Sequence, residues 1–238
     1  MTRDIEPYTI FTFSSAWDVP VPTVTPFGVK LLTWMRMHDL PYRIEVEDNP
    51  SRGPKGKCPW AIVDGEPIGD SQLIIEAIRR HQGIVEDEHL DARQRAVAVA
   101  VRLMLEEHYH QVWEYEVFIH EGGWKRSQDY FDVLPLGWLV RHLARRKLER
   151  QLIARGMGRH THPEVVSMGV IVLDAIDELM GDGPYLFGEV PTSFDATVFG
   201  FLSLTKWAPV QSELWDYFAS LPRLNAYCDR IRELYFPG

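Results

Sequence analysis

The stretch KCPWAIVDGEPIGDSQ, residues 57–72, has a proline near its start and an Asp-Ser pair near its end. Between them, Asp64-Gly65 separates two short apolar arms. This pair is the strongest local signal for a two-residue hairpin, because a type I′ turn needs positive φ angles at both positions. A hairpin of this length returns Asp70 to the side of Pro59. We therefore expect the two ends of the segment to form opposite walls of one small-ligand site.

Pro59 has two interpretations. In the first, it only marks the start of a strand where no N–H donor is needed. In the second, the Cys58–Pro59 bond is cis, which turns the backbone N–H and C=O of Cys58 sideways. Those groups would then face a groove and pair with a peptide-like ligand as an added strand does.

Asp70 and Ser71 precede a short helix with apolar residues Ile74, Ile75 and Ile78 on its inner face. One interpretation is an ordinary N-terminal cap. The other uses the same physics for binding, because free N–H groups at a helix N-terminus attract a carboxylate. Ser71 would add a hydroxyl, and Asp70 could receive a ligand ammonium group. Both interpretations stay open at this point.

Thr25 precedes a helix expected over residues 26–40. Pro26 suits the first helical turn, and Thr25 suits the cap before it. The absence of cysteine at Thr25 and Gly28 excludes a thioredoxin-like CxxC couple, so disulfide reductase chemistry is not expected.

Strands are expected at residues 8–13 and 42–47, on either side of this helix, so a right-handed crossover between parallel strands follows. Pro67 cannot donate to a ladder, which places the second arm of the hairpin at the edge of the sheet. The resulting expectation for residues 1–82 is a thioredoxin-like α/β domain.

The pattern changes near residues 82–90. Beyond them only helical periodicity appears, so residues 90–238 are expected to form an all-α domain. The expected helices cover residues 91–119, 136–156, 163–180, 193–207 and 221–236.

Composition narrows the function classes. The net charge of −9 disfavours nucleic acid and anionic membrane as partners, because both select basic surfaces. Cys58 and Cys228 have no metal-type or redox-type spacing, which is typical of a cytosolic chain. The start of the chain shows no signal peptide, and no apolar run reaches the ~20 residues of a membrane span. We expect a cytoplasmic protein.

The histidines do not predict a metal site. His108 and His110 are two residues apart and diverge on a helix, whereas ligands on one helix face are four apart. His160 and His162 fall in an expected loop without a nearby carboxylate or thiol cluster.

Aromatic side chains of the long helix at 91–119 have two possible roles. Most would pack in the core or at a dimer interface. Tyr109 and Trp113 are also candidates for lining an apolar substrate pocket.

These features together resemble a cytosolic glutathione transferase. The shared features are a strand-opening proline, Asp-Ser at the next helix start, an all-helical second half and the capping box Thr192-x-x-Asp195 in LFGEVPTSFDATVFGFL. The stretches TPFGVKLLTWMRM and GPKGKCPW are most similar to the branch related to failed-axon-connections and metaxin proteins. The resemblance covers nearly the whole chain.

The resemblance implies that glutathione binds in the first domain. The backbone of Cys58, beside Pro59, would pair with its cysteinyl part. Asp70 and Ser71 would hold the γ-glutamyl head, and Lys57 would lie near the glycine carboxylate. The resemblance gives Thr192 and Asp195 a role in folding and none in chemistry.

The resemblance also implies a catalytic position at the start of the first helix. The family places Tyr, Ser or Cys there, aimed at the glutathione sulfur, whereas this chain has Thr25. Ser14, Ser15 and Trp17 in the preceding loop, or a backbone amide, are competitors for the same role.

The function that follows is conjugation of glutathione, as co-substrate, to small hydrophobic electrophiles, in a homodimer. A glutathione-dependent isomerase, dehalogenase or ether-cleaving enzyme would share the same half-site. The alternative from another class is a glutathione-transferase-like binding or assembly protein without turnover. The end of the chain, IRELYFPG, offers no anchor for a role in membrane import.

Overall fold

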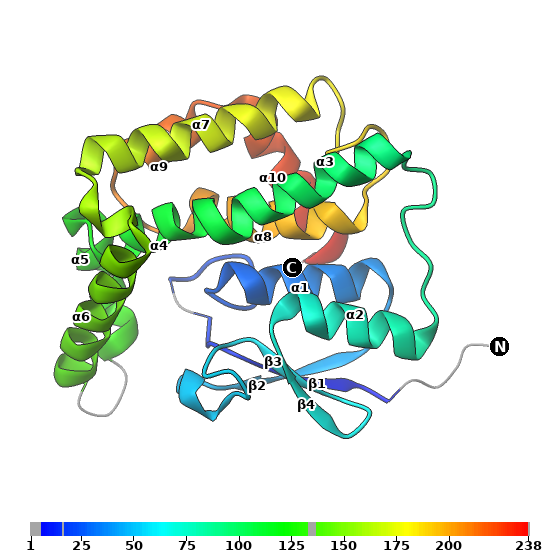
Figure 1. Cartoon of the computed structure of the whole chain (residues 1–238), viewed down its shortest axis with the longest axis horizontal. Coiled ribbons are helices and arrows are strands. Elements are labelled where there is room, and N and C mark those ends of the chain that lie inside the picture. The colour runs from blue at the N-terminus through cyan, green and yellow to red at the C-terminus, as the bar shows by residue number, and fades with distance from the viewer. Residues whose placement is uncertain (1–5, 16, 133–136, 238) are drawn as a thin grey trace.

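The structure is a computed structural model that describes residues 6–15, 17–132 and 137–237. Its N-terminal part is a four-stranded mixed sheet with two helices, and the rest is helical (Figure 1). The strands are β1 (Tyr8–Thr12), β2 (Tyr42–Val46), β3 (Trp60–Val63) and β4 (Glu66–Gly69). The expected fold class, a thioredoxin-like domain followed by a helical part, is confirmed.

The strand order is β2-β1-β3-β4. Strands β1 and β2 are parallel, as the crossover predicts, and β4 lies at the edge, as Pro67 predicts. Asp64 and Gly65 both have positive φ angles, 53° and 80°, which matches a type I′ hairpin.

The register of this hairpin places the polar ends together. Trp60 pairs with Gly69 across β3 and β4, so Pro59 and Asp70 lie at the same end of the two strands. Trp60 also pairs with Phe11 near the end of β1, and the two rings stack with centroids 3.7 Å apart. The loop that leads from β1 to the first helix therefore starts at this same end of the sheet.

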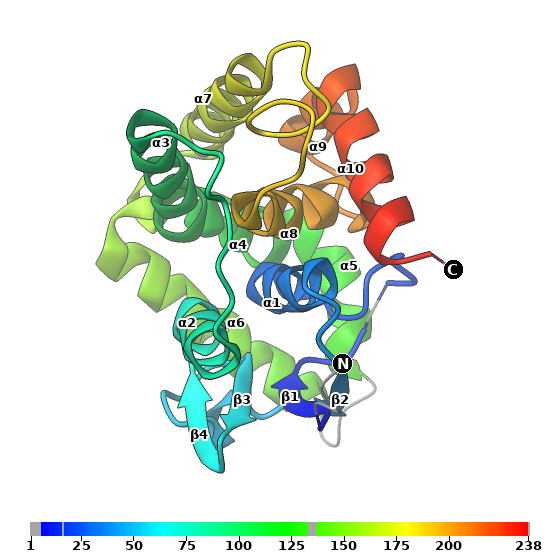
Figure 2. The same ribbon diagram turned by 90° about the vertical axis from the view of Figure 1, so that its right-hand side faces the viewer.

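Helices α1 (Pro26–Met37) and α2 (Ser71–Gln82) lie on the side of the sheet that faces the helical part (Figures 1 and 2). Helix α1 is buried almost all round, because the sheet covers one side and α8 covers the other. Its start is therefore fixed by both parts of the molecule.

The helical part begins after residues 83–91, which contain no helix or strand. The helix expected over 91–119 is present as α3 (Ala92–Leu103), a π-helical segment (Met104–Tyr109) and α4 (His110–Phe118). The helices that follow are α5 (Glu121–Asp132), α6 (Gly137–Arg155), α7 (His162–Met180), α8 (Ser193–Trp207), α9 (Glu213–Ala219) and α10 (Pro222–Tyr235). Two short 3-10 turns cover Pro50–Arg52 and Met157–Arg159.

Sequence patterning missed α5 and α9. Gly122 and Gly123 in the first turn of α5 lower its intrinsic helix propensity. The structure explains Gly123, because a Cβ there would meet the carbonyl oxygen of Glu116 at 1.9 Å. Helix α9 is too short for a periodicity to be read, with 7 residues.

The capping box at the start of α8 is confirmed. The Asp195 carboxylate accepts hydrogen bonds from the Thr192 N–H at 2.7 Å, the Thr192 hydroxyl at 2.8 Å and the Leu186 N–H at 3.0 Å. Since Asp195 is fully buried, these bonds replace the water it loses. Its role is structural, at the centre of the helical part.

One apolar core runs through both parts, from Ile10 of β1 through Leu31 of α1 to Phe199 of α8. In the part of the chain that the structure describes, no helix combines the length and apolar character needed to cross a bilayer.

Candidate functional site

The hairpin end that carries Pro59 and Asp70 forms the first wall of the site. The Cys58–Pro59 peptide bond is cis, as one of the two interpretations predicts. Asp70 follows the edge strand and adopts an unusual positive φ of 90° directly before α2. The two residues adjoin the paired ends of β3 and β4, so the structure brings the two predicted half-sites together.

Asp70 caps α2 and still has capacity to bind a ligand. Its Oδ1 accepts from the N–H groups of Gln72 at 3.0 Å and Leu73 at 3.2 Å. Neither bond uses Oδ2, which leaves that oxygen for a ligand cation. The helix amides of Gln72 and Leu73 are occupied by the cap, so a ligand carboxylate would rely on the hydroxyl and N–H of Ser71.

A buried ion pair stabilises the start of α2 through the side chain of Gln72. The Lys30 ammonium of α1 donates to the Gln72 side chain at 2.7 Å and to Glu106 Oε1 at 2.5 Å. Arg102 donates to the other oxygen of Glu106 at 2.9 Å. Burial lowers the pKa of Lys30, and the charge of Glu106 opposes that shift. The network joins α1, α2 and the π-helical segment, and sequence patterning missed it.

Thr25 lies at the start of α1 but does not cap it with its side chain. The Thr25 carbonyl accepts from the N–H groups of Gly28 and Val29, both at 3.0 Å, whereas its side chain makes no capping hydrogen bond. Its methyl group lies against Gly28, where an added Cβ would come within 2.8 Å of it. The expected side-chain cap is therefore absent, and the helix start does not consume the hydroxyl.

The two serine competitors of Thr25 have partners in the protein. The Ser14 hydroxyl and N–H both donate to Asp48 Oδ1 at 3.2 Å, and the Tyr130 hydroxyl donates to the same oxygen at 2.7 Å. The Ser15 hydroxyl donates to the Val21 carbonyl at 3.4 Å. Both serines thus contribute to the shape of the loop that precedes α1.

The surroundings of the Cys58 thiol favour its protonated form at neutral pH. Burial, with smaller contributions from the charges of Glu47 and Asp48, raises its pKa to about 12. The thiol donates to the Glu47 carbonyl at 3.4 Å. This favours a role of the Cys58 backbone over one of its thiol. Lys57 beside it is exposed.

His110 lies beside the start of α1, a position that sequence reasoning did not predict. It is the first residue of α4, and its ring contacts Phe27 of α1 edge-to-face with centroids 4.8 Å apart. Burial is the main cause that lowers its pKa; the charge of Glu114 opposes the shift, and the charges of Arg155 and Lys57 add to it. A neutral imidazole therefore lies where the helical part meets the start of α1. His110 and Phe27 are far apart in sequence, so no local pattern signals the contact.

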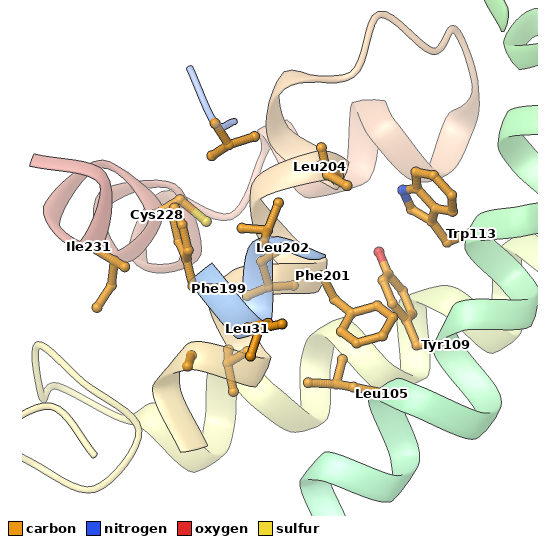
Figure 3. Packing of buried hydrophobic residues seen from close by; sticks show 14 of the residues in the cluster. Leu31, Leu105, Tyr109, Trp113, Phe199, Phe201, Leu202, Leu204, Cys228 and Ile231 are labelled. Carbon is orange, nitrogen blue, oxygen red and sulfur yellow. The ribbon is translucent and has the colours of Figure 1, made fainter. Parts of the chain in front are cut away.

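Tyr109 and Trp113 are core residues. Tyr109 is fully buried and its hydroxyl lies 3.0 Å from that of Thr205, while Trp113 is 3% exposed. Figure 3 shows both side chains within the packed cluster that contains Phe201 and Leu204. Of the two roles expected for these residues, packing in the core is the one that their burial favours.

The expectation that His162 lacks a nearby carboxylate is wrong. Residues 162–180 form α7, and His162 at its start lies 3.0 Å from Glu116 of α4. His120 joins the same pair. The expectation failed because the carboxylate comes from a helix 46 positions earlier in the sequence, which no local pattern reveals.

Residues 26–123 match the glutathione S-transferase N-terminal domain family, and residues 171–231 match the glutathione S-transferase C-terminal domain. Among curated relatives, isoprene-epoxide–glutathione S-transferase of Rhodococcus sp. (strain AD45) is 25% identical, over 95% of this chain and 98% of that protein. Metaxin-1 of Sus scrofa is 29% identical, over 97% of this chain and 76% of that protein. Failed axon connections of Drosophila melanogaster is 28% identical; the match covers 91% of this chain and only 56% of that longer protein.

Solved structures show the same fold. Glutathione transferase GSTFuA3 from Phanerochaete chrysosporium superposes with a TM-score of 0.68 at 14% identity, over 99% of this chain and 100% of that chain. Beta-etherase LigF from Sphingobium sp. strain SYK-6 gives 0.65 at 15% identity, over 95% of each chain. With both domain families matched in order and relatives aligned over nearly its full length, the chain belongs to the glutathione S-transferase superfamily, with failed axon connections and metaxin-1 among its relatives.

Proposed function

We propose that this protein is a glutathione transferase that joins glutathione, as co-substrate, to small hydrophobic electrophiles. The observation that carries the proposal is the pairing of the Asp70–Ser71 helix start with Pro59 at one end of the β3–β4 hairpin. An anion-binding helix start and an exposed carboxylate suit the zwitterionic γ-glutamyl head of glutathione.

Glutathione would lie along the hairpin end. Its α-carboxylate takes the hydroxyl and N–H of Ser71, and its ammonium group takes Oδ2 of Asp70. Its cysteinyl amide pairs with the backbone of Cys58, and Lys57 provides a positive charge near the glycine carboxylate. This orientation directs the thiol toward the start of α1.

Thr25 is the residue we assign to the thiol. A hydroxyl donor at a helix N-terminus stabilises a thiolate through a charge-assisted hydrogen bond and through the helix dipole. Ser14 and Ser15 already donate to Asp48 and to the Val21 carbonyl, which favours Thr25 over both.

The electrophile would bind between the two parts of the molecule, beside Phe27 and His110. Both rings are partly buried and contact each other, so they offer an apolar wall with one polar nitrogen. The relative named isoprene-epoxide–glutathione S-transferase supports a small epoxide as the first substrate to test.

A second function, glutathione-transferase-like binding or assembly without turnover, is favoured by two observations. The position that carries Tyr, Ser or Cys in many transferases carries Thr25 here, and the relatives include proteins named failed axon connections and metaxin-1.

The main proposal includes a cytoplasmic location and a homodimer. The molar mass in solution, measured by light scattering, tests the dimer.

The test is glutathione affinity measured by calorimetry, followed by turnover with a panel of epoxides and other small electrophiles. Ser71→Ala and Asp70→Ala should each weaken glutathione binding at least tenfold. Asp91→Ala is the matched control, because Asp91 is also an aspartate that caps a helix, α3, outside the site. Equal affinity in all four proteins would remove the half-site. Tight glutathione binding without turnover on the whole panel would instead support the binding function.

A further inference from the structure

A second cluster of chemically capable side chains lies in the helical part, on elements separate from the Asp70–Ser71 site. Glu116 near the end of α4, His120 just after it and His162 at the start of α7 each offer one ligand-type atom, and these atoms all lie within 4.8 Å of one another. We propose that these three residues form a binding site for a divalent transition-metal ion, with Zn²⁺ as the best match.

The burial of Glu116 is the first argument. Its side chain is fully buried, and within the described residues its carboxylate has only ion-pair contacts with His120 and His162 and no geometrically well-formed hydrogen bond. Ser212, the cap of α9, borders the carboxylate. A desolvated carboxylate without full pairing is costly, and coordination of a cation is one of the arrangements that removes the cost.

The distances are the second argument. Glu116 Oε1 lies 3.0 Å from His162 Nε2, and Glu116 Oε2 lies 3.7 Å from His120 Nδ1. In a tetrahedral zinc site with bonds of roughly 2.0–2.2 Å, neighbouring ligand atoms are about 3.3–3.6 Å apart. These two separations bracket that range, and all three ligand atoms lie within 4.8 Å of one another, so side-chain movement alone can bring the donors to one ion.

The donor set is the third argument. Two imidazoles and one carboxylate are a common zinc ligand set, and they leave a fourth position for water. Glu213 on the solvent side lies 3.8 Å from His162 Nε2 and is exposed, so its carboxylate adds negative charge at the entrance. Together Glu116 and Glu213 balance the two positive charges of the ion.

The stacked histidine rings predict a specific movement. The rings of His120 and His162 are nearly parallel, at 6°, with centroids 3.8 Å apart. An imidazole nitrogen binds a metal in the plane of its ring, so one ion cannot lie in both of these planes. His162 is already near Glu116, and its ring also lies nearly parallel to that of Tyr115, with centroids 6.2 Å apart. We therefore infer that the His120 ring turns out of the stack when the ion binds.

The test is calorimetric titration of the chelator-treated, tag-free protein with zinc chloride. We expect one zinc ion per chain and a melting temperature that rises with zinc concentration, as for any ligand that binds only the folded state. Glu116→Gln and His162→Asn should each weaken zinc binding at least tenfold and remove the melting shift. His160→Asn is the matched control, because His160 lies two residues from His162 beside the exposed Glu164, and it should bind zinc as the wild type does.

Absence of stoichiometric binding to the wild type, or unchanged binding in Glu116→Gln and His162→Asn, would overturn the site. Should those variants fail to fold, diethyl pyrocarbonate labelling of the wild type decides the matter. Zinc should then protect His120 and His162 from modification and leave His160 reactive. Equal labelling of His120 and His162 with and without zinc would refute the proposal.

Discussion

Thr25 stands where the partial positive charge of α1 favours an anion, and its side chain is not used to cap the helix. An ordinary thiol with a pKa near 8.5 is only a few per cent ionised at about pH 7. A hydroxyl donor stabilises the thiolate and lowers that pKa, so its loss must raise the pKa. We expect Thr25→Val to raise the pKa of bound glutathione and to lower turnover at neutral pH, while Thr25→Ser keeps both.

The measurement for Thr25 is the ultraviolet absorbance of the thiolate in the glutathione complex, titrated with pH. If Thr25→Val folds and titrates as the wild type does, the hydroxyl has no part in the chemistry, and a backbone donor takes its place.

Residues of the site differ in how far the sequence could predict them. Pro59 and Asp70 were predictable because a tight hairpin fixes their relation locally, and the register bears this out. Lys30 and Glu106 were not, because their pairing depends on how α1 docks against a helix 76 residues later. The approach of His162 to Glu116 was hidden for the same reason.

At the scale of elements, α8 was predicted with its bounds, because the capping box marks its start. The π-helical segment Met104–Tyr109 was not predicted, since one wide turn barely disturbs a 3.6-residue period. That segment contains Glu106, which pairs with Lys30 of α1. Helix ends with caps were thus predictable, whereas the irregular turn inside a long helix was not.

The contact between α1 and α8 depends on Gly200. A Cβ at Gly200 would lie 2.7 Å from the Pro26 carbonyl oxygen and 3.0 Å from the Lys30 amide nitrogen, both backbone atoms of α1. Gly200→Ala must therefore push α1 away from α8. We expect a loss of about 1–3 kcal/mol in the free energy of unfolding and weaker glutathione binding, because the start of α1 moves.

Gly169→Ala in α7 is the matched control for Gly200→Ala. Its Cβ would meet side-chain atoms, the Leu214 methyl groups at 2.7 and 2.8 Å, which can turn aside. The helix propensity gained, about 1 kcal/mol, offsets part of that strain. Urea unfolding and glutathione calorimetry compare the two variants. Similar values for both would show that the close approach of α1 and α8 tolerates a methyl group.

At the scale of the whole molecule, the glutathione site we propose is shared between the two parts of the chain. The sheet, cis-Pro59 and α2 come from the N-terminal part, while His110 and Glu106 come from the helical part. One continuous core passes between them, so the two parts should unfold together. Coupling between them therefore controls the geometry of the site.

The Lys30–Glu106 ion pair tests that coupling, since its side chains are 2% and 9% exposed and belong to different parts of the molecule. Glu106→Gln leaves the buried Lys30 ammonium without its countercharge, and breaking such a pair costs about 3–5 kcal/mol. Glu121→Gln, which breaks the exposed pair with Arg145, should cost less than about 1 kcal/mol. Urea unfolding at pH 7 measures both.

The loss in the free energy of unfolding caused by Glu106→Gln should also depend on pH, and it should become smaller as the pH rises. Burial lowers the pKa of Lys30 from its ordinary value of 10.5, and loss of Glu106 lowers it further. Between the lowered pKa and 10.5, the unfolded chain binds more protons than the folded one, so stability rises with pH. The variant should therefore recover part of its lost stability, relative to the wild type, as the pH is raised from 7 toward 10. The double variant Lys30→Met with Glu106→Leu should show no such recovery, because it has no buried charge to neutralise. A deficit that stays constant with pH in Glu106→Gln would mean that lost packing, and not an unpaired ammonium, destabilises the junction between the two parts.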